Sequence, residues 1–258
     1  MGLIISGAGA ILLSVNLGWN ITYIIMALFI LIGIITNLVL KEKKKEIGEI
    51  DKNFVENSVI NPIKDFVTRQ GWYVIVIFLL LYKLNNATIA TFANPFYKDI
   101  GFSKEQIAYV VKIYGLFATL IGGFLGGVIV SKVKMIPCLL WTGIVEAFTS
   151  IAFAYLAYVC VTSPNVEVLM AVVSFDNLVG SIGNVVLIAY LSSLCNRSYT
   201  ATQYALLSSL IAVSRDFLAA FTGIVLDNIG YIDFFVFNAF LVVPSLLLIR
   251  YLPKVEKK

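Results

Sequence analysis

Long apolar segments separated by polar connections run along almost the entire chain. Most of these segments reach the roughly 20 residues that a helix needs to cross the hydrocarbon core of a bilayer. Because most of the connections are short, consecutive helices should lie antiparallel. The pattern predicts an all-α integral membrane protein with about eight transmembrane helices. They are expected at residues 2–17, 20–40, 72–96, 105–131, 136–161, 166–195, 201–227 and 231–252.

Local signals mark several of the boundaries between these segments. Turn-forming residues separate neighbouring segments at residues 18–20 and 227–230. Ser103 and Thr200 are each followed three residues later by a glutamine. This is the spacing of a capping box, in which two side chains bind free backbone N–H groups at a helix start. It predicts a helix start at both places.

One connection, residues 41–70, is much longer than the others. It opens with a run of charges and later contains Asn61 and Pro62, which suit the cap and the first turn of a helix. Three apolar residues that follow share one face of such a helix: Ile63, Phe66 and Val67. We expect a short helix lying on the inner membrane surface. A solvated linker with a chance apolar stripe fits the same residues.

Composition narrows the class of protein. Of the 258 residues, 60% are hydrophobic, against about 45–50% in an ordinary soluble domain, and this excludes a soluble enzyme. The chain has no histidine, which removes serine–histidine hydrolysis, histidine-ligated haem and most zinc chemistry. The three cysteines form no C-x-x-C pair. We therefore expect no metal, no cofactor and no nucleic-acid partner.

The basic residues are distributed unequally between the two sides that alternating helices create. Of the 19 lysines and arginines, three lie inside apolar segments, and only Lys98 and Lys104 lie on the side opposite residues 41–70. Cytoplasmic loops of membrane proteins carry the excess of basic residues. The distribution therefore predicts that the long connection and the C-terminus are cytoplasmic.

Six ionisable residues lie within the apolar segments, three basic and three acidic: Lys83, Lys112, Arg215, Glu146, Asp176 and Asp216. An ionised group at the bilayer centre costs roughly 2.5–3.5 kcal/mol on insertion scales, so all six cannot face lipid. Their equal numbers indicate partial mutual neutralisation around a polar cavity on a substrate or proton path. A charge pair that only locks helix packing is the alternative.

Polar and small neighbours extend this interpretation. Gly180 and Gly183 follow Asp176 on one helical face and leave room for another group. The residues expected on the substrate or proton path are Lys83, Asn86, Lys112, Glu146, Asp176, Asn177 and Arg215. A glycine run at residues 122–127 has the G-x-x-x-G spacing of close helix packing. It lacks the lysine and hydroxyl residue that would follow in a phosphate-binding loop.

Three segments carry a more specific pattern: residues 81–84, residues 176–178 with Gly180 and Gly183, and residues 194–208 with Arg215. Together they resemble the second half of the AmpG-type muropeptide permeases, a branch of the major facilitator superfamily. Two further segments, residues 126–134 and 223–230, resemble features of the superfamily as a whole. The resemblance covers nearly the whole chain. It departs at two places, because the family pattern implies an acidic residue where this chain has Asn85 and Asn86, and the basic loop at residues 126–134 lacks its usual aspartate.

The resemblance implies a partial major-facilitator fold. Residues 1–40 would form the last two transmembrane helices of the first half, and residues 41–70 the central cytoplasmic loop with its interfacial helix. Residues 71–258 would form the complete second half of six helices. Since the family fold has two such halves, the first four helices are expected to be missing, as in a truncated frame or one piece of a split gene.

The resemblance also implies a function, which is import of cell-wall muropeptides across the bacterial inner membrane by proton symport, without enzymatic activity. In this interpretation Lys83, Lys112 and Arg215 attract the peptide carboxylates of the substrate. Asp176 or Glu146 takes the coupled proton. The expected partners are the lipid bilayer, the muropeptide, protons and a separately encoded N-terminal half.

Three other functions fit the sequence less well. One is a non-transporting remnant, and another is a major-facilitator transporter of a different small solute. The third is a membrane-embedded acyl or glycosyl transferase. Such an enzyme needs a catalytic loop with a clustered acid or nucleophile at the membrane surface, and the long connection resembles a charged linker instead.

Overall fold

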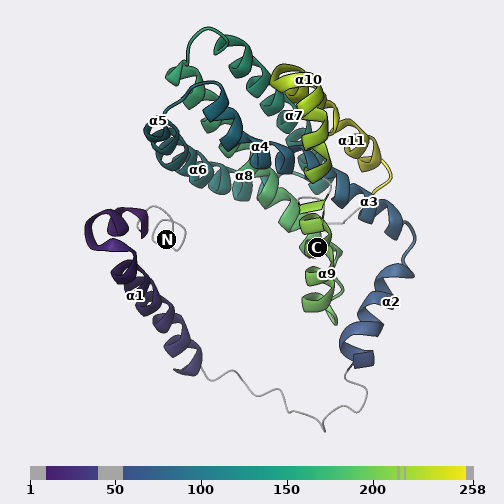
Figure 1. The fold of residues 1–258 in the computed structure, drawn as a ribbon. Helices are drawn as coiled ribbons and strands as arrows, with labels where there is room; N and C mark the ends of the chain where they lie inside the picture. Colours follow the sequence, from purple (N-terminus) through teal and green to yellow (C-terminus); the bar gives the residue numbers. More distant parts are fainter. Residues whose placement is uncertain (1–9, 40–54, 214–215, 218, 254–258) are drawn as a thin grey trace. The chain divides into compact units, whose positions relative to one another are not determined.

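The computed structural model describes residues 10–39, 55–213, 216–217 and 219–253 (Figure 1). These residues are almost entirely helical and include no β-strand, which confirms the predicted all-α class. Six helical stretches among them are long and apolar enough to cross a membrane. The chain divides into two compact units, residues 1–54 and 55–258.

In the first unit the described helix is α1 (Ala10–Val39), which contains the candidate span Leu17–Thr36. Its backbone leaves the helical conformation at Gly18, where φ is 76° and ψ is 161°. Glycine tolerates this conformation because it has no β-carbon. The break confirms the turn predicted at residues 18–20. Residues 2–9, half of the predicted segment 2–17, lie outside the described residues, as does the charged run that opens the long connection.

The second unit holds the other five candidate spans. Four of them match predicted segments: Trp72–Asp99, Lys104–Lys132, Met135–Val159 and Val166–Leu194. The helices of this unit, in chain order, are η2 (Glu56–Ile60), α2 (Asn61–Val67), α3 (Trp72–Tyr82), α4 (Leu84–Asp99), α5 (Lys104–Tyr109), η3 (Val110–Tyr114), α6 (Gly115–Lys132), α7 (Met135–Val159), α8 (Val166–Leu194), α9 (Thr200–Val213), α10 (Ala219–Phe240) and α11 (Val243–Ile249).

The last two predicted segments correspond to α9, α10 and α11. The backbone of α10 turns at Gly230, with φ 75° and ψ 172°, which confirms the turn predicted at residues 227–230. The candidate span Phe221–Ile249 includes this turn. α9 is a shorter apolar helix, and residues 214, 215 and 218, which follow it in the predicted segment 201–227, lie outside the described part of the chain.

The predicted helix starts have mixed outcomes. The capping box at Ser103 is confirmed, because the Ser103 hydroxyl and the Gln106 side chain each accept a hydrogen bond from the other residue's backbone N–H. α9 begins at Thr200 as predicted, but the capping box expected there is wrong. The Gln203 side chain turns away to bind the Asn196 backbone N–H at 2.7 Å. Asn61 is not a helix cap either, since η2 runs directly into α2.

α2 does not present its whole apolar stripe on one side of the protein. Phe66 is buried in the protein interior, whereas Ile63 and Val67 are exposed. Pro62 lies in the first turn, as predicted, and is buried as well. α2 is therefore anchored by Phe66, and two apolar side chains remain free to meet lipid or another surface.

Two apolar clusters form the interior of the second unit. Buried members of the first cluster include Phe78, Leu79, Tyr82, Leu139, Val186, Tyr190 and Leu191. Buried members of the second cluster include Ile89, Phe96, Phe153, Leu169, Val173, Phe234 and Phe235. Along α4, α7 and α8, most of the buried residues that lie between the two clusters are polar or small. A polar layer therefore separates two apolar regions within the helix bundle.

Glycines bring α6 and α8 into close contact. A β-carbon at Gly122 would collide with the backbone carbonyl of Leu178, and one at Gly126 would lie 2.9 Å from the Val185 side chain. The Ser181 hydroxyl also donates to the Thr119 carbonyl across this contact, at 2.8 Å. Close packing by the G-x-x-x-G pair is thus confirmed, as is typical of helix contacts in membranes.

A polar network fastens α2 to the turn between α8 and α9. The Arg69 guanidinium donates to the Asp65 carboxylate, to the Leu194 carbonyl at 2.5 Å and to Gln203 Oε1 at 3.2 Å. The Gln203 and Asn196 amides donate to the two Asp65 oxygens at 2.7 and 3.2 Å. The hydrogen bond from Gln203, helped by those from Arg69 and Asn196, holds the pKa of the Asp65 carboxyl below its usual range.

We expect Gly122→Ala to destabilise the protein by about 1–3 kcal/mol, the usual cost of overpacking, because the new methyl group must push α8 away. Gly127→Ala is the matched control, since nothing lies within 4 Å of a β-carbon at that position. It should leave the stability unchanged or raise it slightly through helix propensity. Thermal unfolding of the detergent-solubilised chain measures both, and equal midpoints would contradict the packing argument.

We expect Asp65→Asn to lower the unfolding temperature at pH 7 and to lose this effect in acid. The pKa of Asp65 is lower in the folded chain than the unfolded value of about 3.9. Its stabilisation is therefore complete above about pH 5 and is lost as the pH falls through the folded pKa. Thermal unfolding between pH 7 and pH 3 should show the gap between the two proteins closing. Lys64→Gln, an exposed neighbour, is the control, and a constant gap would argue against the network.

Candidate functional site

The polar layer between the two apolar clusters contains three of the charged residues that the sequence singles out. Lys83 lies at the break between α3 and α4, Glu146 lies on α7, and Asp176 lies on α8. Each is far apart from the others in the chain, so only the packing of the three helices brings them together. The layer lies within candidate membrane spans on all three elements.

Lys83 and Glu146 form a buried ion pair. The Lys83 ammonium donates to Glu146 Oε1 at 2.7 Å, and the two side chains are only 5% and 1% exposed. The backbone of Lys83 is not helical, with φ −96° and ψ 0°, so the pair lies where α3 ends and α4 begins. Removing two charges from water is costly, and each ion here depends on the other for compensation.

The glycines of α8 make room for this pair. A β-carbon at Gly183 would collide with the Glu146 carboxylate and would lie 3.4 Å from the Lys83 ammonium. A β-carbon at Gly180 would lie 3.0 Å from the side-chain nitrogen of Asn86. The prediction that Gly180 and Gly183 leave space for another group is confirmed, and the groups they admit are the amide and the ion pair.

Asp176 lies next to the pair on the same face of α8. Its carboxylate is within hydrogen-bonding reach of the Thr149 side chain and interacts through charge with both Lys83 and Glu146. Oδ1 of Asp176 and Oε2 of Glu146 are buried, and neither has a hydrogen-bond partner in the part of the chain that the structure describes. One cation and two carboxylates therefore share the layer, with an oxygen of each carboxylate open to a further donor.

A second polar group in the layer is uncharged. The Asn85 amide donates to the Ser150 hydroxyl at 2.7 Å and to the Asn238 carbonyl at 2.9 Å. The Asn238 amide donates in turn to the Asn85 carbonyl at 3.2 Å, and all three residues are fully buried. Sequence reasoning missed Ser150 and Asn238 because uncharged residues in an apolar segment carry no insertion penalty large enough to stand out.

The remaining predicted path residues lie elsewhere or are not described. Asn177 faces α6, where its side-chain oxygen accepts from the Thr119 hydroxyl at 3.2 Å. Its amide nitrogen donates to the Val173 carbonyl, one turn earlier on α8, at 2.8 Å. Lys112 lies in the π-helical turn η3, where it is exposed and takes no part in the buried ion pair. Arg215 lies outside the described residues. The structure thus brings together Lys83, Asn86, Glu146 and Asp176 of the predicted set.

This arrangement places titratable groups where a proton can be bound or released. With all three groups ionised, Lys83, Glu146 and Asp176 carry one net negative charge, which a single proton would cancel. Intramembrane ionisable residues of this kind mark ion and substrate paths. Within the described ranges, no group of three or more Asp, Glu, Cys or His residues is placed to hold a metal ion.

The chain matches the Major Facilitator Superfamily over residues 1–215. It is 34% identical to the putative transporter AmpG 4 of Rickettsia felis, across 98% of this chain and 62% of that protein. It is 32% identical to the anhydromuropeptide permease of Escherichia coli K12, across 96% of this chain and 50% of that protein. The chain therefore spans between half and about three-fifths of the length of these relatives.

We expect the ion pair to behave as a coupled unit. Lys83→Met or Glu146→Gln alone leaves one buried charge without its partner and should cost about 3–5 kcal/mol of stability. Lys83→Met combined with Glu146→Gln removes both charges, so most of that stability should return. Thermal unfolding in detergent measures the three variants, with the exposed Lys98→Met as control. A double variant whose loss equals the sum of the single losses would contradict the coupling.

Proposed function

The chain belongs to the Major Facilitator Superfamily, and from this premise we propose that it is a membrane transporter, or part of one, that imports cell-wall muropeptides by proton symport. The observation that carries the proposal is the buried Lys83–Glu146 ion pair with the half-buried Asp176 beside it, within candidate membrane spans. The substrate class comes from the relatives, one of which is named an anhydromuropeptide permease. Absence of enzymatic activity is part of the same proposal.

The charge balance of the polar layer gives a mechanism for coupling. A muropeptide carries peptide carboxylates, and Lys83 is the buried cation that can receive one of them. With Glu146 and Asp176 both ionised, the layer already has one excess negative charge and opposes a further anion. A proton on Asp176 removes that excess, so proton and substrate each favour binding of the other.

The two carboxylates have different roles in this mechanism. Glu146 is held by Lys83 at 2.7 Å and keeps the cation in place when substrate is absent. Asp176 has no cation directly bonded to it among the described residues and is the group that we propose takes the proton. The Asn86 amide, which lies against Gly180, is the proposed partner for sugar hydroxyls. The roles of Lys112, Asn177 and Arg215 on the path remain predictions from the sequence.

The proposed location is the bacterial inner membrane, with several helices crossing the bilayer and the C-terminus in the cytoplasm. The orientation is supported by the excess of basic residues on the side of residues 41–70. The division into two helices of a first half (residues 1–40), a central loop (41–70) and a second half (71–258) stays a proposal as well. Because the chain spans only part of its relatives, a separately encoded N-terminal half is a candidate partner.

The test is uptake of labelled anhydromuropeptide by cells that lack their own permease. We expect the chain to support uptake, either alone or when it is produced together with the N-terminal part of the Escherichia coli permease that lies beyond the match. Asp176→Asn should abolish uptake driven by the proton gradient and preserve exchange of labelled for unlabelled substrate. Asp227→Asn, at an exposed position, is the matched control.

Each outcome of this experiment separates one alternative. A fluorescent protein fused to the C-terminus, which matures in the cytoplasm, reports both production and orientation. Uptake in neither format, with the protein inserted in the membrane, would favour a non-transporting remnant. Uptake that other small solutes displace as well as muropeptide does would indicate a different substrate. Unchanged proton-driven uptake by Asp176→Asn would remove Asp176 from the coupling mechanism.

A further inference from the structure

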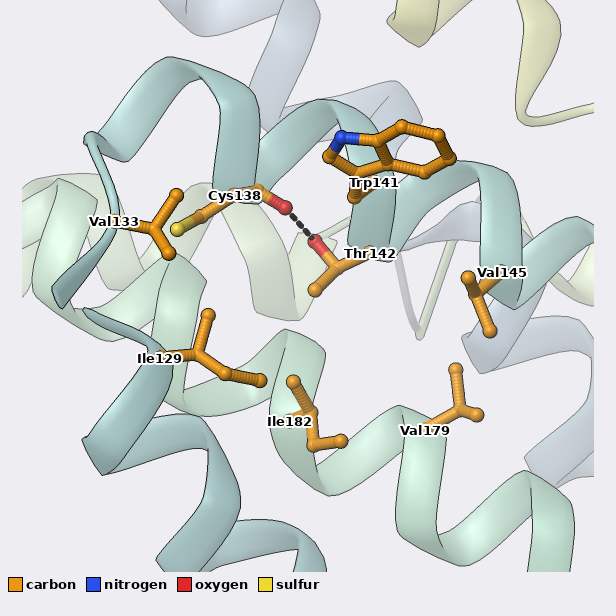
Figure 2. A pocket seen from close by; sticks show the side chains of 8 residues that line it. All are labelled: Ile129, Val133, Cys138, Trp141, Thr142, Val145, Val179 and Ile182. Atoms are coloured by element: carbon orange, nitrogen blue, oxygen red, sulfur yellow. Dashed lines mark hydrogen bonds between the residues drawn. The ribbon is translucent and has the colours of Figure 1, made fainter.

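An apolar furrow lies between α6 and α7, with α8 as its floor. Eight residues line it: Ile129, Val133, Cys138, Trp141, Thr142, Val145, Val179 and Ile182. Figure 2 shows these side chains converging from the three helices, with the only polar contact drawn running from the Thr142 hydroxyl to the Cys138 carbonyl, at 2.7 Å. The furrow has a volume of about 230 Å³.

The furrow is open to the surroundings along one edge. Trp141 is 65% exposed and Val133 is 41% exposed, although both line the space. The α6–α7 connection is short, but the two helices scarcely touch, because α6 packs mainly against α8 and α7 packs against α8 and α10. The two helices therefore diverge above α8 and leave an apolar furrow within membrane-spanning segments.

Positive charge lies at the end of this furrow. Lys132 is the last residue of α6 and Lys134 directly precedes α7, so the two flank Val133, and both are exposed. The sequence has no acidic residue between Glu105 and Glu146, so nothing in this stretch neutralises the two lysines. The first turn of α7 has no side-chain cap and therefore presents free backbone N–H groups in the same place.

We propose that this furrow binds one acyl chain of an anionic phospholipid, with the phosphate head group held by Lys132 and Lys134. A wholly apolar furrow in a membrane takes a hydrocarbon chain, and a basic cluster where helices leave the membrane takes a negative head group. The combination selects a lipid that has both.

The experiment uses the fluorescence of Trp141. The chain has three tryptophans, so Trp19→Phe with Trp72→Phe leaves Trp141 as the single emitter at the furrow. The purified full chain is titrated in detergent micelles with brominated phosphatidylglycerol or brominated phosphatidylcholine, because bromine quenches only a tryptophan that it touches. We expect half-maximal quenching at a several-fold lower fraction of the anionic lipid.

Variants assign this preference to the proposed residues. Lys132→Gln with Lys134→Gln should move the anionic curve onto the zwitterionic one, whereas Lys98→Gln with Lys104→Gln, at other exposed lysines, should leave it in place. Val145→Phe, which fills the furrow, should weaken quenching by both lipids. Equal quenching by the two lipids before any lysine is changed would overturn the proposal. So would an anionic preference that survives the loss of Lys132 and Lys134.

Discussion

A charge inside a membrane must be compensated within the protein, and Lys83 and Glu146 of the second unit meet this requirement for one another. An ammonium or a carboxylate left alone in the hydrocarbon core is costly. The pair joins the break between α3 and α4 to the middle of α7 at 2.7 Å. The position of α8 depends on it as well, because only a residue without a side chain fits where Gly183 meets the Glu146 carboxylate. The ion pair therefore constrains three helices at once.

The same small residues that admit polar groups on one side of α8 serve packing on the other. Gly180 and Gly183 face the amide and the ion pair, whereas Gly122 and Gly126 of α6 let that helix approach the opposite side of α8. Helices in lipid gain little from apolar burial against one another, and close van der Waals contact replaces that gain. α8 is consequently the central element of the unit, enclosed by α6 and α7.

Hydropathy and charge predicted most of the helices and the principal charged residues. Lys83, Glu146 and Asp176 were found because an ionised residue in an apolar segment is expensive wherever the helix points. Which of these residues pair with one another could not be predicted, since the rotation of each helix about its axis decides which side chains meet. The helix cap predicted at Thr200 failed for a related reason, because Asp65 competes for the Gln203 side chain from a segment 138 residues away. Lys112 is exposed because it lies in a π-helical turn, which shifts the helical face.

The two apolar clusters on either side of the polar layer limit how an ion can reach it. They consist of packed aromatic and aliphatic side chains, such as Phe78 and Tyr190 in the first cluster or Phe96 and Phe153 in the second. Stripping an ion of water in such surroundings costs far more than thermal energy supplies. Packing therefore opposes the passage of ions through either cluster, and the partly exposed Asp176 is the charged member of the layer that lies open at the surface of the unit.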